Sequence, residues 1–158
     1  MDKFLDWVKD YLENSFANDS DISKKVIVDL AYKQGNTITT TNTPQIQIQI
    51  MDNAEVERYS SFEGENTSSI PLQITVYTSQ TKINNVMKSA QESSIIFGQK
   101  IKTLLNKLRE SVVNENILRC RIATISPALP LLDGSKVYMT AIRCEFWVTN
   151  PYKEIKGE

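Results

Sequence analysis

The chain of 158 residues contains no histidine, and this absence removes several kinds of chemistry at once. Without imidazole there are no Ser-His or Cys-His dyads, no histidine general bases and almost no zinc sites of the common types. Only five glycines are present, and none has the spacing of a phosphate-binding loop. The sequence therefore predicts a protein that is not an enzyme and that holds no metal, nucleotide or other cofactor.

Long apolar runs and a strong net charge are also missing. No run approaches the roughly 18 to 20 residues that cross a bilayer. The 18 Lys and Arg nearly balance the 19 Asp and Glu, which argues against a general nucleic-acid footprint. We expect a protein that is made and used in the cytoplasm, without membrane contact.

Cysteine is scarce, because the chain has only Cys120 and Cys144. Each lies inside a strand-like segment, and their spacing matches neither a redox motif nor a metal motif. We expect both to be small buried hydrophobes rather than a disulfide.

What is present suits one globular domain, spanning residues 1–158, with 41% hydrophobic residues. Met1 to Phe16 has apolar and aromatic residues at helical spacing and predicts an amphipathic helix. Lys25 to Tyr32 is a short apolar run that fits a buried strand or a second helix, and periodicity does not decide between them.

Several segments alternate as strands do. Gln45 to Ile50 places isoleucines on one face and Gln45, Gln47 and Gln49 on the other. Glu55 to Tyr59 could pair back on it as a charged edge strand, and alternation resumes from Ile70 to Tyr77.

The strongest pattern is a predicted central helix from Lys82 to Ser111, with Ser79 or Thr81 as its N-cap. Apolar and small residues recur there in steps of four and three: Ile83, Met87, Ala90, Ser94, Phe97, Ile101, Leu104 and Leu108. Such a stripe can form a coiled coil or cover a sheet. The small residues Ala90, Ser94 and Gly98 favour the sheet, because they let strand side chains approach closely.

Two further strands, Ile117 to Ile125 and Val137 to Thr149, are joined by a turn-rich connection. An antiparallel pair would put charged side chains on one face (Arg119, Arg121, Arg143 and Glu145) and Cys120, Ile122, Ile142, Cys144 and Phe146 in the core. The element order predicts an α+β fold, a mixed or mainly antiparallel sheet covered by the two helices on one face.

Polar segments complete the chain. Loops are predicted at Lys33 to Thr43 and Tyr59 to Ser69, and a loose tail at Lys153 to Glu158. Long loops in a small domain often meet a partner, so we interpret both as candidate contact regions.

An acidic cluster supplies the rival hypothesis, a metal-dependent nuclease built on Asp52, Glu55 and Glu57, with Glu63 and Glu65 nearby. These residues fall on a turn, an edge strand and a loop, which favours a plain solvated edge over a metal site.

Taken in order, the elements resemble the tail terminator proteins of long-tailed bacteriophages and of phage-tail-like particles, also called tail completion or head-tail joining proteins. The resemblance covers nearly the whole chain. It is carried by the strings Pro44 to Ile50, Pro71 to Tyr77, Gly98 to Ile101 and Val137 to Phe146, in that order around the long helix.

The resemblance implies a ring, typically a hexamer, that caps the tail tube, ends its growth and offers a surface to the head or neck. Expected partners are further copies of the chain, the tail-tube protein, a neck or head-completion protein and, in a contractile tail, the sheath. DNA would be only passing cargo, and the protein would end in the virion or tail-like particle. The candidate contact residues are the glutamine face (Gln45, Gln47, Gln49), the charged face (Arg119, Arg121, Arg143, Glu145) and the two loops. Another tail or neck component, such as a tube protein or a head-tail stopper, remains the structural alternative.

Overall fold

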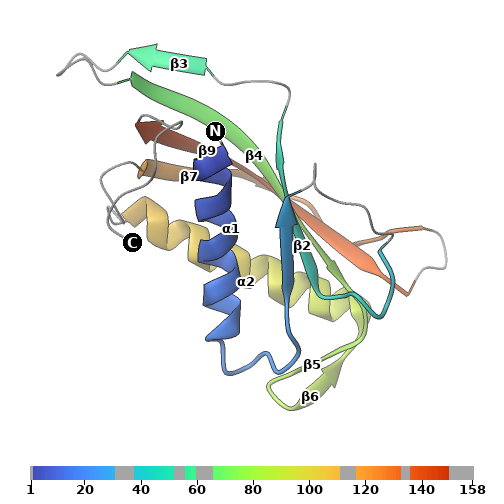
Figure 1. Ribbon diagram of the computed structural model, residues 1–158. Coiled ribbons are helices and arrows are strands. Elements are labelled where there is room, and N and C mark those ends of the chain that lie inside the picture. The colour runs from blue at the N-terminus through green and yellow to red at the C-terminus, as the bar shows by residue number, and fades with distance from the viewer. Residues whose placement is uncertain are drawn as a thin grey trace.

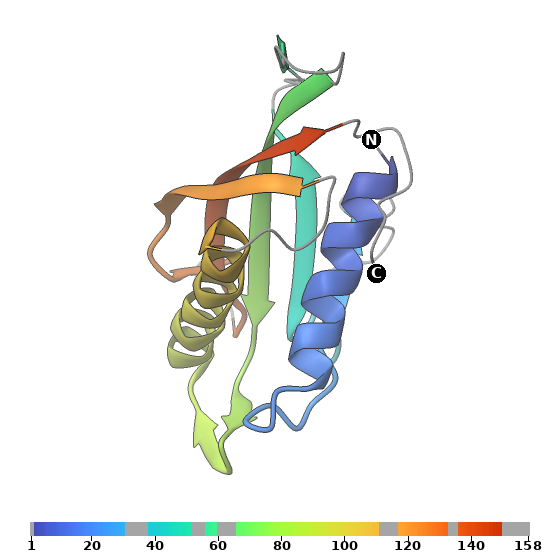
Figure 2. The ribbon, with the colours of Figure 1, turned by 90° about the vertical axis from the view of Figure 1, so that its left-hand side faces the viewer.

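A mixed β-sheet with helices packed on one of its faces forms the core of the molecule (Figure 1). The computed structural model describes residues 2–30, 38–51, 56–59, 66–110, 117–132 and 136–149. Turned by 90°, the molecule shows both helices on the same side of the sheet (Figure 2). The predicted α+β class is confirmed.

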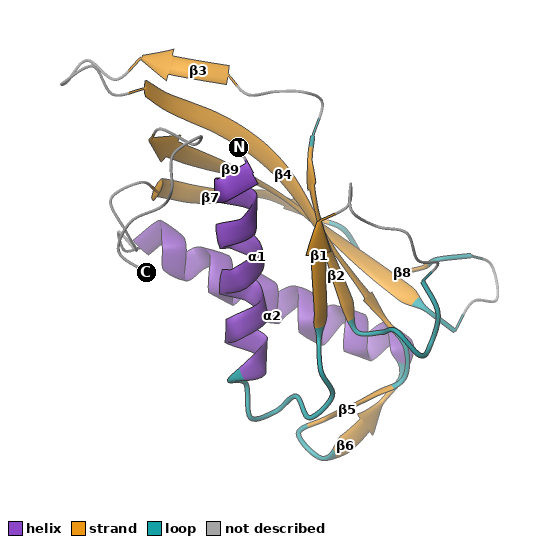
Figure 3. Cartoon of the chain, viewed as in Figure 1, coloured by secondary structure: helices purple, strands orange, loops and turns teal. Residues whose placement is uncertain are grey.

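The main path through the sheet runs β1-β2-β4-β9-β7 (Figure 3). These strands are β1 (Ile27–Leu30), β2 (Gln45–Ile50), β4 (Asn66–Thr78), β9 (Tyr138–Thr149) and β7 (Ile117–Ile125). Two short strands extend it, since β3 (Val56–Tyr59) pairs with β4 and β8 (Leu129–Pro130) pairs with β9. β1 and β2 are parallel, and the other pairs in this sheet are antiparallel. The open choice for Lys25 to Tyr32 is therefore settled as a strand.

Two predictions about the middle of the chain are wrong. β3 pairs with the first part of β4 and not with β2, whose two edges are occupied by β1 and by the second part of β4. The predicted loop from Tyr59 to Ser69 is shorter than expected, since residues 66–69 belong to β4 and gain backbone hydrogen bonds from β3 and β9. Residues 60–65 lie outside the described residues, as do 33–37 of the other predicted loop.

The N-terminal helix is confirmed as α1 (Asp2–Ala17), and its apolar side is buried. Phe4 meets Phe146 edge to face at 5.2 Å, and Phe16 stacks on Phe97 at 5.4 Å. The Tyr11 hydroxyl donates to the backbone oxygen of Leu104 at 2.8 Å. These contacts fix α1 against the sheet and the second helix along most of its length.

The predicted central helix is correct only from residue 90 onward. α2 spans Ala90–Glu110, whereas residues 81–88 form a hairpin of β5 (Thr81–Ile83) and β6 (Val86–Lys88). Asn84 and Asn85 have positive φ, which suits a tight hairpin turn and interrupts the helical pattern. Ser89, not Ser79 or Thr81, is the N-cap, because its Oγ accepts from the Glu92 N–H at 3.2 Å.

Within α2 the small residues have the role that the sequence indicates. Ser94 shares a 2.7 Å hydrogen bond with Thr140 of β9. A Cβ on Gly98 would lie 3.0 Å from Thr140 Cγ2, so a larger residue at this position would require Thr140 or the helix to shift by a few tenths of an ångström. α2 packs on β4, β7 and β9, which confirms the sheet as its partner.

β7 and β9 pair antiparallel, as predicted. The residues assigned to the core point toward the helices, with Cys120, Ile142, Cys144 and Phe146 buried and Ile122 half-buried. Both cysteines are free. Their mutual hydrogen bond and their burial raise the pKa of the Cys144 thiol well above its usual value. The tail at 153–158 lies outside the described residues.

Candidate interaction surface

The face of the sheet opposite the helices, which we call the open face, holds most of the predicted contact residues. Side chains alternate along each strand, so the residues between the buried ones point away from α1 and α2. They comprise Asp29 of β1, Gln45, Gln47 and Gln49 of β2, Gln73, Thr75 and Tyr77 of β4, Arg121 of β7, and Met139, Ala141, Arg143 and Glu145 of β9. No described helix covers this face (Figure 2).

One end of the open face is polar yet already buried within the chain. Gln45 and Gln47 are only 5% and 8% exposed, and Gln49 alone of the three glutamines is exposed. Gln47 lies between Thr75 on β4 and Asp29 on β1 in the strand register. Of the three glutamines predicted to meet a partner, Gln45 and Gln47 are therefore buried within the chain, and Gln49 is exposed. That this face meets a partner stays a prediction.

The buried glutamines retain unused hydrogen-bonding atoms. Gln45 Oε1 and Gln47 Nε2 have no hydrogen-bond partner among the described residues. An unsatisfied buried amide atom costs about 1–3 kcal/mol. Burial also raises the pKa of Tyr77, which stands opposite Gln45. This end of the face combines burial with incomplete polar pairing.

The other end of the open face is charged and accessible. Arg121 and Arg143 are exposed, and Glu145 is half-buried. Arg121 stands directly opposite Glu145 across β7 and β9. Arg143 Nε donates to Gln73 Oε1 at 3.4 Å, and Gln73 Nε2 donates to Thr75 Oγ1 at 3.2 Å. The predicted grouping of these charges on one face is confirmed for the three side chains that the structure describes. The side chain of Arg119 lies outside them.

The described part of the two predicted contact loops is small. Thr43, at the end of the first loop, is buried and shares a 2.6 Å hydrogen bond with Ser79. Asn42 Oδ1 accepts from the Thr39 backbone N–H at 2.7 Å. Thr43 and Thr40 are thus tied to Ser79, just after β4, while the side chains of residues 39–41 are exposed.

The acidic cluster of the rival hypothesis is not placed by the structure. Asp52, Glu55, Glu63 and Glu65 lie outside the described residues, and so does the side chain of Glu57, whose backbone belongs to β3. Among the side chains that are described, no group of three or more Cys, Asp or Glu could hold a metal ion.

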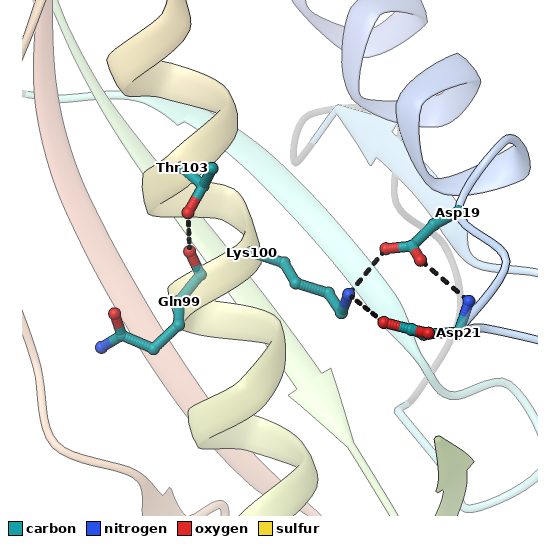
Figure 4. Close-up of polar contacts among 5 residues, drawn as sticks. All are labelled: Asp19, Asp21, Gln99, Lys100 and Thr103. Atoms are coloured by element: carbon teal, nitrogen blue, oxygen red, sulfur yellow. Dashed lines mark hydrogen bonds and ion pairs between the residues drawn. The ribbon is translucent and has the colours of Figure 1, made fainter. Parts of the chain in front are cut away.

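The structure brings together one polar cluster that no sequence pattern indicates. Lys100 of α2 bridges Asp19 and Asp21 in the loop after α1, with Nζ at 2.8 Å and 3.3 Å from their Oδ2 atoms (Figure 4). Asp19 Oδ1 also accepts the Asp21 backbone N–H at 3.0 Å. About eighty residues separate the lysine from its partners, so spacing along the chain carries no signal for this contact.

The titration of this cluster follows from its pairing. Partial burial raises the pKa of Asp19, but the hydrogen bonds from Lys100 and Asp21 and the lysine charge outweigh it, so the pKa is lowered. Burial lowers the pKa of Lys100, and the two carboxylates outweigh that effect and raise it. The groove beside the cluster, of about 520 Å³, runs along α2 past Phe16, Ile95 and Leu104. The charged residues that line this groove, Lys100, Asp19 and Asp21, pair with one another. Such pairing is typical of residues that stabilise a fold rather than of catalytic groups.

Comparison of the chain with protein-family models gives no match, and comparison with curated proteins gives none either. Among the described residues, no helix has the length and apolar character needed to cross a membrane.

Proposed function

We propose that the protein is a structural subunit that assembles into a ring, as tail terminator proteins of long-tailed phages and phage-tail-like particles do. The observation that carries the proposal is the open face. A large part of a central sheet has no helix over it and ends in the exposed arginines 121 and 143. A surface of this kind suits contact with another protein, since interfaces are enriched in arginine and have polar rims.

Two further observations support this reading over an enzyme. The charged residues that the fold brings together are satisfied ion pairs or exposed strand residues, and no acid-base pair faces an enclosed cavity in the described part of the chain. The arrangement of a mixed sheet flanked by helices is also the architecture that the resemblance implies. In this proposal the ring, typically of six copies, caps the tail tube and offers a surface to the neck.

The decisive experiment measures assembly. The purified protein is examined by mass photometry and electron microscopy, alone and with the tail-tube protein. Rings are expected, and a persistent monomer in the presence of the tube protein would contradict the proposal. Depletion during particle production separates the structural alternatives. Loss of a terminator gives abnormally long tails, whereas loss of a tube protein gives no tails.

The carboxylate nuclease makes a different prediction. Titration calorimetry with magnesium and manganese, followed by a plasmid cleavage assay, should be silent if the ring proposal is correct. Metal-dependent cleavage that disappears in the variant Glu57→Gln would favour the enzyme instead.

A further inference from the structure

The solvent side of α1 is acidic. Asp10 is exposed and Asp6 and Glu13 are half-exposed, and at helical spacing the three share the side that faces away from the core. Lys9 neutralises part of this charge by pairing with Glu13 at 3.4 Å. Neither aspartate has an ion-pair partner among the described residues. We call the side chains of Asp6, Asp10 and Glu13 the acidic stripe.

The opposite side of the molecule carries two exposed arginines, with Glu145 half-buried opposite Arg121. Arg121 and Arg143 are exposed on the open face. No described carboxylate lies within ion-pair distance of either guanidinium group. Arg143 has one long hydrogen bond, to Gln73 at 3.4 Å, which leaves its remaining donors available. Arginine pairs well with carboxylates because its planar group donates two parallel hydrogen bonds.

The placement of the two charged surfaces determines the kind of contact that they can make. α1 lies in the helix layer (Figure 2). Arg121 and Arg143 alternate along their strands with the buried residues Cys120, Ile142 and Cys144, so they point to the other face of the sheet. Within one copy the sheet separates them. Between copies, each molecule can present its stripe to one neighbour and its arginines to another. Such a head-to-tail contact is heterologous, and it generates a ring when the rotation closes.

We propose that the acidic stripe of α1 in one copy docks on the Arg121 and Arg143 end of the open face in the next copy. The inference rests on the proposed ring and names its subunit contact. Both sides of the contact are rigid before assembly. α1 is held by Phe4, Phe16 and Tyr11, and both arginines stand on paired strands of the sheet. Ordering the interface therefore costs little, which favours specific association.

The test uses charge reversal on each side of the contact. Asp10→Arg places an arginine on α1 where the contact would bring it to Arg143 of the next copy, and Arg143→Glu places a carboxylate where it would meet Asp10. Each variant alone should assemble at least about tenfold more weakly than the wild type, because like-charge contact across an interface is repulsive. An equimolar mixture of the two should recover rings, because alternating copies then make only attractive contacts.

Further variants and measurements serve as controls. Circular dichroism establishes that each variant is folded, and Asp6→Arg with Arg121→Glu provides a second pair should one variant fail to fold. Lys82→Glu changes an exposed charge on the hairpin, away from both surfaces, and should assemble as the wild type does. Higher salt should weaken the wild-type ring, since exposed charge pairs are screened.

The outcomes separate this inference from the proposed function. Wild-type rings with unaffected single variants would overturn the docking contact and leave the ring standing. Weakened variants whose mixture does not recover would also overturn it, because the two surfaces would then not meet each other. A wild type that never assembles, even with tube protein, overturns both.

Discussion

At the scale of single residues, the most informative side chains are those whose charge or polarity is enclosed by the fold. Lys100 and its two aspartates hold the loop after α1 against α2. Gln45 and Gln47 each have a buried amide atom without a hydrogen-bond partner among the described residues. The first group stabilises the fold and the second weakens it, and each can be tested by one substitution.

Replacing Lys100 by methionine should lower the free energy of unfolding by about 1–2 kcal/mol near neutral pH, because two partly buried carboxylates lose their cation. The pKa of Asp19 is depressed in the folded state. The stability that Asp19 contributes is therefore present above its unfolded pKa of about 3.9 and is lost as pH falls through its folded pKa. Urea unfolding of both proteins between pH 7 and pH 3 should show the difference shrinking toward the acid end.

The raised pKa of Lys100 gives the same cluster an alkaline limit. The contribution of Lys100 to the free energy of unfolding is complete below the unfolded pKa of about 10.4 and is lost as pH rises through the folded pKa.

Lys102→Met, at an exposed position on the same helix, is the matched control for Lys100→Met and should change the free energy of unfolding by less than about 0.5 kcal/mol. Equal losses in the two variants would show that the ion pairs contribute nothing.

Gln47→Leu should leave the free energy of unfolding of the isolated chain unchanged or raise it by up to about 1 kcal/mol. The reason is that it removes a buried donor without a described partner. Chemical denaturation measures the change, and Gln49→Leu on the exposed end of the same strand is the comparison. A loss above about 1 kcal/mol would mean that the amide of Gln47 is satisfied in solution.

At the scale of elements, the difference between prediction and structure is clearest in the central helix. Its stripe from residue 90 onward is confirmed at Ser94, Phe97, Ile101 and Leu108, which are buried. Leu104 is only half-buried, and the fully buried leucine of that turn is Leu105, which the predicted stripe does not include. The apparent continuation through Ile83 and Met87 has another cause. Ile83 is buried because it bridges to Ile22, whereas Met87 is 57% exposed on the hairpin. Apolar spacing over a few residues does not distinguish a short hairpin from a helical turn.

The hairpin turn allows a direct test of this correction. Asn85 has φ of 62°, a conformation that a β-branched side chain adopts only at a cost of about 1–2 kcal/mol. Asn85→Val should therefore reduce stability by that amount, while Asn85→Gly should be neutral or slightly stabilising. Thermal unfolding of the two variants gives the measurement. A helix through this position would instead make glycine the more damaging of the two.

At the scale of the whole molecule, both helices lie on one side of the sheet, and much of the other side is left to carry charge. This asymmetry gives the molecule two different surfaces. A molecule of this kind can repeat head to tail, which is the requirement for a ring.

If the ring forms, thermal stability must depend on protein concentration. Self-association at a hundredfold excess over the dissociation constant stabilises the folded state by about 2.7 kcal/mol. For a domain of this length that raises Tm by about 5–10 °C. Scanning calorimetry over a hundredfold concentration range should show the rise in the wild type and a flatter response in Arg143→Glu. A Tm independent of concentration in the wild type would contradict self-assembly.

By itself the sequence determined the class of the fold, the amphipathic α1, the strands β2, β4, β7 and β9, and the division of β7 and β9 into charged and core faces. Alternation and helical spacing are local, so they report which side of an element is buried. Only the tertiary structure decided that β3 pairs with β4, that the hairpin precedes α2, and that Gln45 and Gln47 are covered. It alone joined Lys100 to Asp19 and Asp21, and it placed the acidic stripe and the arginines on opposite sides of the sheet. Those facts depend on which distant segments become neighbours, and that choice is made by packing of the whole core rather than by any single segment.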